Sequence, residues 1–189
     1  HRYVDSDGVR IHYVVMGDGP LMVMVHGYPD YWYTWRDQME ALAGDYTVVA
    51  MDTRGYNLSD QPTGVENYDL EILGNDVAAV IEAEGEDSAI IVGHDWGGGI
   101  AWFFAAHRPE MTDQLIILNL LHPSNVAREL ARFEQQHENS AYARGFQQPN
   151  SETGWRGVEH YATRLASDKL TYEGVYPLTF KEAQDESEE

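Results

Sequence analysis

The sequence predicts an α/β fold with a mostly parallel sheet flanked by helices, and three observations support this. Short, almost wholly apolar runs alternate with longer segments of helical spacing over about the first 120 residues. The helical segments stop at glycine or proline. The apolar runs are too continuous for strands with one face in water, as expected of strands buried on both faces. Right-handed βαβ connections would place the loops after these strands at one edge of the sheet, where sites form.

We expect the elements in the following order. A hairpin comes first, with strands at residues 3–4 and 10–15 and the turn at 5–8. Buried strands at 21–25, 46–51, 89–92 and 115–120 then alternate with helices at 31–43, 69–84 and 97–107. Polar helices at 124–137 and 139–148 predict an inserted, mainly helical lid, or cap, that ends in an acidic stretch. The expected domains are therefore a core at 1–122 and a cap segment at 123–189.

Composition limits the classes of function. The 189 residues are 43% hydrophobic, enough for one core, and no run of apolar residues is long enough to span a membrane. Twelve basic against 32 acidic residues give a net charge of −20, which argues against nucleic acid and anionic membranes as partners. This balance fits a solvated acidic surface or a salt-adapted source. The sequence has no cysteines and no His/Asp/Glu cluster at the spacing of metal ligands, so we expect no metal site. It also has no G-x-G-x-x-G motif for a dinucleotide, and we expect no cofactor.

The stretch from Ile90 to Trp102 carries the strongest signal for chemistry. Within it, residues 93–97 have the form G-x-nucleophile-x-G between a strand and a helix, with Asp95 at the centre. An aspartate there can attack an electrophilic carbon and form an ester. The helix N-terminus behind it offers free N–H groups to a carboxylate. The alternative is that Asp95 only caps the helix and that the glycines only allow close packing.

Four segments together resemble the epoxide hydrolases of the α/β-hydrolase fold: residues 26–36 (HGYPDYWYTWR), 52–56 (DTRGY), 93–98 (GHDWGG) and 142–149 (YARGFQQP). The elbow alone is shared with haloalkane and haloacetate dehalogenases. The H-G-aromatic-P segment and the Tyr-x-x-x-Phe-Gln-x-Pro segment are more similar to epoxide hydrolases. The resemblance covers roughly the first 150 residues, and it implies an α/β-hydrolase fold with a cap.

The resemblance also implies a reaction and the residues that perform it. Asp95 would open the epoxide and become alkylated, and water would release a vicinal diol without a cofactor. The backbone N–H groups of Tyr28 and Trp96 would form the oxyanion hole. Tyr142 would donate a hydrogen bond to the epoxide oxygen, because an alkoxide is a poor leaving group. Trp32, Tyr28 and Trp96 would line the substrate pocket, which favours an apolar or aryl epoxide.

Other polar residues in these segments have structural interpretations. His26 and His94 are expected to be structural, and Arg54 is expected to brace its loop. Two alternative functions stay open. One is a haloalkane or haloacid dehalogenase with the same nucleophile, in which the Trp96 indole would hold halide. The other is a non-catalytic, ligand-binding member of the fold.

The second half of the mechanism has no candidates in the sequence. In this family the water-activating histidine and its acid partner follow later core strands. His107 ends the predicted helix at 97–107, His122 opens the cap, and His137 and His160 fall within it, so none is in the expected place. We therefore expect this pair, a second cap tyrosine and the C-terminal part of the core after residue 189, and no turnover by this chain alone. The sequence shows no leader peptide, so the cytoplasm is the default location, although a leader that has been cleaved would not be visible. A homodimer is a further possibility that the sequence does not decide.

Overall fold

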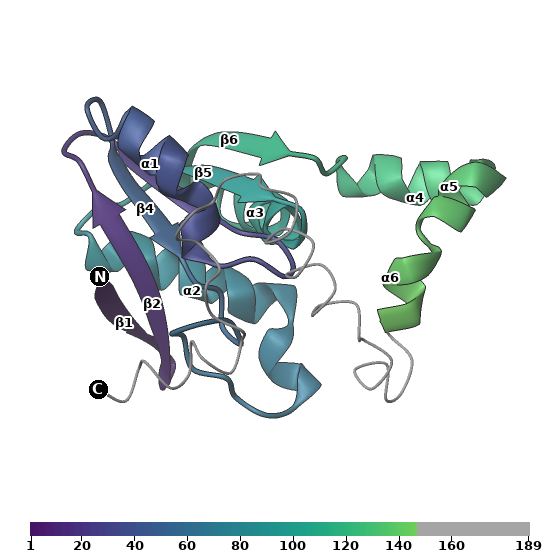
Figure 1. The fold of residues 1–189 in the computed structure, drawn as a ribbon, viewed down its shortest axis with the longest axis horizontal. Coiled ribbons are helices and arrows are strands. Elements are labelled where there is room, and N and C mark those ends of the chain that lie inside the picture. The colour runs from purple at the N-terminus through teal and green to yellow at the C-terminus, as the bar shows by residue number, and fades with distance from the viewer. Residues whose placement is uncertain (147–189) are drawn as a thin grey trace, which may run out of the picture. The chain divides into compact units, whose positions relative to one another are not determined.

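The computed structural model describes residues 1–146, which contain a six-stranded sheet in the order β1-β2-β4-β3-β5-β6 (Figure 1). Strands β4, β3, β5 and β6 are parallel, and β1 and β2 form an antiparallel hairpin that joins β4. The strands are β1 Arg2–Ser6, β2 Val9–Met16, β3 Leu21–Val25, β4 Thr47–Met51, β5 Ala89–His94 and β6 Thr112–Leu118. The helices are η1 Trp32–Trp35, α1 Arg36–Leu42, η2 Val65–Tyr68, α2 Leu70–Ala83, α3 Trp96–His107, η3 Pro109–Met111, α4 Pro123–Arg132, α5 Glu134–Asn139 and α6 Ala141–Phe146.

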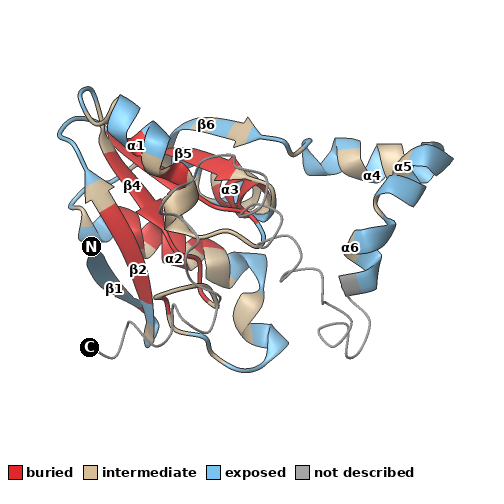
Figure 2. Cartoon of the chain, in the orientation of Figure 1, coloured by how far each residue is buried: buried red, intermediate tan, exposed pale blue. Residues whose placement is uncertain are grey.

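The central strands are buried on both faces, and alternate residues belong to two separate apolar clusters. In β3, Leu21, Val23 and Val25 face a cluster completed by apolar residues of α2 and α3. Met22 and Met24 face the opposite cluster, which Trp35 and Met39 complete from the other side of the sheet. This is the period-two geometry of a strand, and Figure 2 shows the resulting buried centre. Each fully buried aliphatic side chain contributes about 1.5–3 kcal/mol, so the layers hold the strand ends firmly in place.

Residues His1–Val126 form one compact unit, and a second unit begins at Ala127, within α4. The predicted core at 1–122 and cap segment at 123–189 remain a prediction, since residues 147–189 lie outside the described part. Within the described part, the second unit consists of α4 from Ala127 onward, α5 and α6. No helix among residues 1–146 is long and apolar enough to cross a bilayer.

The predicted α/β fold with a mostly parallel sheet is confirmed, and several predicted elements need correction. The hairpin turn is 7–8 rather than 5–8, because β1 pairs with β2 as far as Ser6. The helix expected from residue 139 starts at Ala141. The expected helix at 31–43 starts with the 3₁₀ turn η1 and becomes α-helical only at Arg36. The last strand of the described residues is β6 at 112–118 rather than 115–120, because Thr112 and Gln114 already pair with β5, although both side chains are polar. After β6, Asn119 has a φ of 60°, which ends the strand. The expected helix at 124–137 breaks at Phe133, whose φ of −122° and ψ of 111° are extended.

Candidate active site

Asp95 lies at the tip of the turn between β5 and α3, as the motif predicts. Its φ of 53° and ψ of −123° are unusual for a residue with a side chain, and such a conformation costs about 1–3 kcal/mol. The turn is closed by the N–H groups of Gly98 and Gly99, which donate to the Asp95 carbonyl at 2.9 and 3.3 Å. The chain therefore keeps a strained backbone at the residue that would act as nucleophile.

The Asp95 side chain does not cap its own helix. It makes no capping hydrogen bond to α3, and Oδ1 instead accepts the backbone N–H of Tyr28 at 3.1 Å. The alternative in which Asp95 is only an N-cap is thereby contradicted. Trp96 is the first residue of α3, so its N–H is not used by the intrahelical ladder. Tyr28 N–H thus contacts the Asp95 carboxylate, and the oxyanion-hole roles of Tyr28 and Trp96 stay predictions.

Close backbone approach around Asp95 requires glycine at two positions. A Cβ on Gly27 would lie 2.4 Å from the Asp95 Cβ. A Cβ on Gly97 would lie 2.2 Å from the Val25 carbonyl oxygen. The loop after β3 and the start of α3 are therefore packed directly against each other, and this packing brings Tyr28 N–H to the carboxylate.

His26 fixes the beginning of the same loop. Thr53 N–H lies 3.1 Å from His26 Nε2, and since a backbone N–H can only donate, Nε2 carries the lone pair. The ring proton is then on Nδ1, which donates to the Gly27 carbonyl at 2.8 Å. Complete burial lowers the pKa of His26, and the hydrogen bond to Gly27 opposes this only in part. The ring is neutral at pH 7, and both of its nitrogens are engaged by backbone groups, as the structural interpretation of His26 expects.

Two further polar side chains are electrostatically coupled to Asp95. Burial raises the pKa of Tyr56 to about 12, with Tyr28, Asp95 and Asp30 adding to the effect, so its hydroxyl stays protonated at pH 7. The Tyr56 ring also stands edge-on to His26 at 4.9 Å. Burial likewise raises the pKa of Asp30, more than the opposing influence of His26 lowers it. Sequence reasoning assigned no role to Tyr56 or Asp30, although both belong to the segments that carried the resemblance.

Arg54 braces its loop as predicted. Its guanidinium forms a bidentate ion pair with Asp76 of α2 at 2.7 and 2.6 Å, and both side chains are almost fully buried. It also donates to the Asn67 carbonyl at 3.1 Å. The loop between β4 and α2 is therefore attached to α2 at the edge of the sheet where Asp95 lies.

The predicted pocket residues differ in exposure. Trp96, which follows Asp95 in the chain, is 54% exposed, and Tyr28, which donates to the Asp95 carboxylate, is 36% exposed. Trp32 is half-buried, and its ring packs edge-on against Tyr33 at 5.0 Å. Tyr142 lies on α6 in the second unit and is 64% exposed. The roles of all four in substrate binding remain predictions, and residues 147–149 of the cap motif lie outside the described part.

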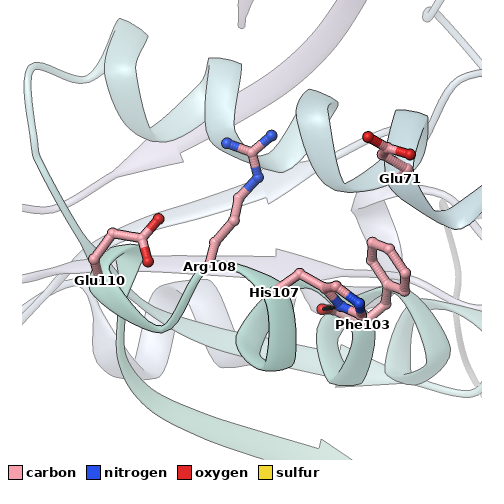
Figure 3. A pocket seen from close by; sticks show the side chains of 5 residues that line it. All are labelled: Glu71, Phe103, His107, Arg108 and Glu110. Atoms are coloured by element: carbon pink, nitrogen blue, oxygen red, sulfur yellow. Dashed lines mark hydrogen bonds between the residues drawn. The ribbon is translucent and has the colours of Figure 1, made fainter.

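A separate hollow of about 520 Å³ lies on the surface of α2 and the end of α3 (Figure 3). It is lined by Glu71, Phe103, His107, Arg108 and Glu110. His107 and Asp95 lie at opposite ends of the 12-residue α3, about 18 Å apart by helix geometry, so this hollow is not part of the surroundings of Asp95. Among residues 1–146, no group of three His, Cys, Asp or Glu side chains could hold a metal ion.

The geometry above matches what is found by comparison with known proteins. A family model described as "alpha/beta hydrolase fold" matches residues 20–170. The chain belongs to the α/β-hydrolase fold family. Epoxide hydrolase 1 of Caenorhabditis elegans is 47% identical over 143 residues, and human epoxide hydrolase 4 is 40% identical over 153. The resemblance of this α/β-hydrolase to epoxide hydrolases is therefore confirmed.

Solved structures give the same result. A Bacillus megaterium epoxide hydrolase in complex with an inhibitor superposes with a TM-score of 0.76 at 40% identity, over 86% of this chain and 55% of that one. A mutant epoxide hydrolase from Bacillus megaterium, complexed with its diol product, has a TM-score of 0.81 at 36% identity, over 97% and 64%. This α/β-hydrolase chain spans only 35% and 42% of the length of the two curated relatives above.

Proposed function

We propose that the protein hydrolyses epoxides to vicinal diols through an ester formed on Asp95. The observation that carries the proposal is the elbow itself, where a strained aspartate directs its carboxylate away from its helix and toward the Tyr28 N–H. An N-cap or packing role requires neither feature. The relatives and solved structures named epoxide hydrolase support the choice of substrate class.

In the first step, one carboxylate oxygen of Asp95 attacks an epoxide carbon. The ring C–O bond breaks, and its electron pair goes to the epoxide oxygen. Tyr142 would donate its hydroxyl proton to that oxygen, which leaves a hydroxyalkyl ester on Asp95, and the tyrosine recovers a proton from solvent.

In the second step, water adds to the ester carbonyl and the negative charge that develops on oxygen is stabilised by the N–H groups of Tyr28 and Trp96. Collapse of this intermediate breaks the ester bond, releases the diol and restores the carboxylate. We assign the water-activating base to no residue of 1–146. His12 pairs with Asp52 at 2.6 Å, but it is fully buried and its other ring nitrogen contacts His1.

The test is the intact mass of the complete protein after brief mixing with styrene oxide. We expect a covalent adduct in the wild type and in Asp87→Asn, an exposed carboxylate that serves as the matched control, but none in Asp95→Asn. A single turnover in ¹⁸O-water should place label in the protein before it appears in the diol. Halide release from a bromoalkane without epoxide turnover would instead establish a dehalogenase. A folded protein that reacts with neither substrate would favour the third alternative, a non-catalytic protein that only binds a ligand.

Tyr142 is tested separately by Tyr142→Phe, which keeps the ring and removes the hydroxyl. Loss of a general acid costs about 10²–10⁴-fold, so adduct formation should slow by at least about 100-fold. Binding of a non-reactive diol should be unchanged, because the ring remains. An unchanged rate of adduct formation would remove Tyr142 from the mechanism.

A further inference from the structure

We infer that Asp52 is a positioning residue that holds the loop carrying the Tyr28 N–H, the predicted oxyanion-hole donor. The inference rests on the proposed role of Asp95. Asp52 directly follows β4, is fully buried, and does not itself contact Asp95 by any hydrogen bond that the described residues show.

The Asp52 carboxylate joins three segments that are distant in sequence. Its Oδ1 accepts the backbone N–H of Trp32 at 2.8 Å. Its Oδ2 accepts the Asn57 side-chain amide at 2.8 Å and lies 2.6 Å from His12 Nδ1. The backbone carbonyl of Asp52 accepts the Ser59 hydroxyl at 2.7 Å. One buried carboxylate therefore connects β2, the start of η1 and the loop after β4.

The loop between β3 and η1 is held at both ends by consecutive residues after β4. At its start, His26 accepts the Thr53 N–H and donates to Gly27. At its end, the N–H of Trp32 is bound by Asp52. Between these two attachments the loop is only five residues long, from 27 to 31, and the Asp30 N–H donates to the Gly27 carbonyl at 3.0 Å. Tyr28 lies within this span, so the position of its N–H depends on both attachments.

An asparagine at position 52 could not accept all the hydrogen bonds that the Asp52 carboxylate accepts. The Oδ2 position of Asp52 receives donors from both His12 and Asn57, so an amide nitrogen there would face two donors. An amide turned the other way would face the Trp32 N–H instead. Asp52→Asn should therefore loosen the loop in either orientation. A displacement of about 1 Å in a group that stabilises developing charge can cost about 100-fold in rate.

The substitution Asp52→Asn should slow ester hydrolysis much more than it slows alkylation of Asp95. Ester hydrolysis develops a full negative charge on the oxygen that the Tyr28 N–H binds, whereas alkylation disperses the charge already present on Asp95. We therefore expect Asp52→Asn to slow ester hydrolysis by about 10–100-fold and alkylation by less than about 3-fold. The alkylated protein should then accumulate in the steady state, which a loss of folded protein alone would not cause.

The experiment measures both rates by single-turnover intact mass on the complete protein with styrene oxide. Glu84→Gln is the matched control, because Glu84 is also a buried carboxylate, with its side chain 6% exposed, and it accepts hydrogen bonds from Arg2 and Tyr13 away from the site. In this control we expect the ratio of the two rates to stay as in the wild type. An Asp52→Asn protein with the wild-type ratio, or with the same change as the control, would overturn the inference.

Asn57→Gly provides a second variant if Asp52→Asn does not fold. Asn57 has a φ of 44°, so glycine fits its backbone while it removes one donor to Asp52. The expected change has the same direction and a smaller size, about 2–5-fold in ester hydrolysis. An unchanged ratio of rates in Asn57→Gly would then count against the inference. Failure of the wild type to form any adduct would contradict the proposed function instead, so the two failures are distinguishable.

Discussion

Gly27 is the residue at which the smallest change should disturb Asp95, the proposed nucleophile. In Gly27→Ala the new methyl group would lie 2.4 Å from the Asp95 Cβ and 2.9 Å from its Oδ1, so either Asp95 or the loop must move. We expect adduct formation to slow by about 100-fold, because reacting groups misplaced by about 1 Å lose that much. Gly44→Ala is the control, since nothing lies within 4 Å of a Cβ there. Equal rates of adduct formation in the two variants would show that the contact is easily relieved.

His26 gives a pH dependence of stability whose sign follows from its burial. Its pKa is lowered in the folded protein, from an ordinary value of 6.5. Below about pH 6.5 the unfolded chain therefore binds a proton that the folded chain does not, and the free energy of unfolding falls by up to about 1.4 kcal/mol per pH unit. This contribution is complete above pH 6.5 and is lost as the pH falls toward the folded pKa. Urea unfolding between about pH 8 and 5 should show a shallower decline in His26→Gln, and parallel declines would contradict the assignment.

At the scale of the elements, the Arg54–Asp76 pair attaches the loop after β4 to α2. Asp76→Leu should lower the free energy of unfolding by about 3–5 kcal/mol, because it leaves a buried guanidinium without its partner. Removing both charges in the double variant Arg54→Met, Asp76→Leu should recover part of that loss, since two apolar side chains need no partner. Urea unfolding of the single and double variants forms the cycle. A double variant less stable than Asp76→Leu would show that the unpaired guanidinium is not the main cause of the stability lost in Asp76→Leu.

The sheet and its order along the chain could be predicted because the information is local. Buried parallel strands leave continuous apolar runs, and β3 was predicted at its observed bounds. The ends that were mispredicted depend on distant partners. The polar start of β6 is held by backbone pairing with β5, which leaves no side-chain pattern. The break at Phe133 has neither glycine nor proline to mark it.

In the candidate site, too, residues within one short segment could be predicted, whereas residues whose partners are distant in sequence could not. The elbow is one short segment, so its motif was sufficient to place Asp95. Asp52 was missed because an aspartate after a strand is ordinary in a turn, and its partners His12, Trp32 and Asn57 come from three other segments. The partnership of Tyr28 with Asp95 was predicted from the family motif and not from sequence pattern.

At the scale of the whole molecule, charge is distributed so that little of the acidic excess is neutralised. Five arginines of residues 1–146 form ion pairs with carboxylates. Their partners are Glu84, Asp60, Asp37, Asp76 and Glu129. The chain as a whole has only 12 basic residues against 32 acidic ones, so most carboxylates have no cation of their own. Repulsion among them disfavours the compact state.

Salt should therefore stabilise the protein. The screening length falls from about 10 Å at 0.1 M to about 3 Å at 1 M, so repulsion across the surface of a chain with net charge −20 is largely removed over that range. We expect the melting temperature of the 189-residue chain to rise between about 0.1 and 1 M sodium chloride, by roughly 2–4 °C for each 1 kcal/mol gained. Sucrose is the control, because it strengthens burial by exclusion from the surface without screening charge. A melting temperature that rises in sucrose but not in sodium chloride would show that the acidic excess is too well solvated to destabilise the fold.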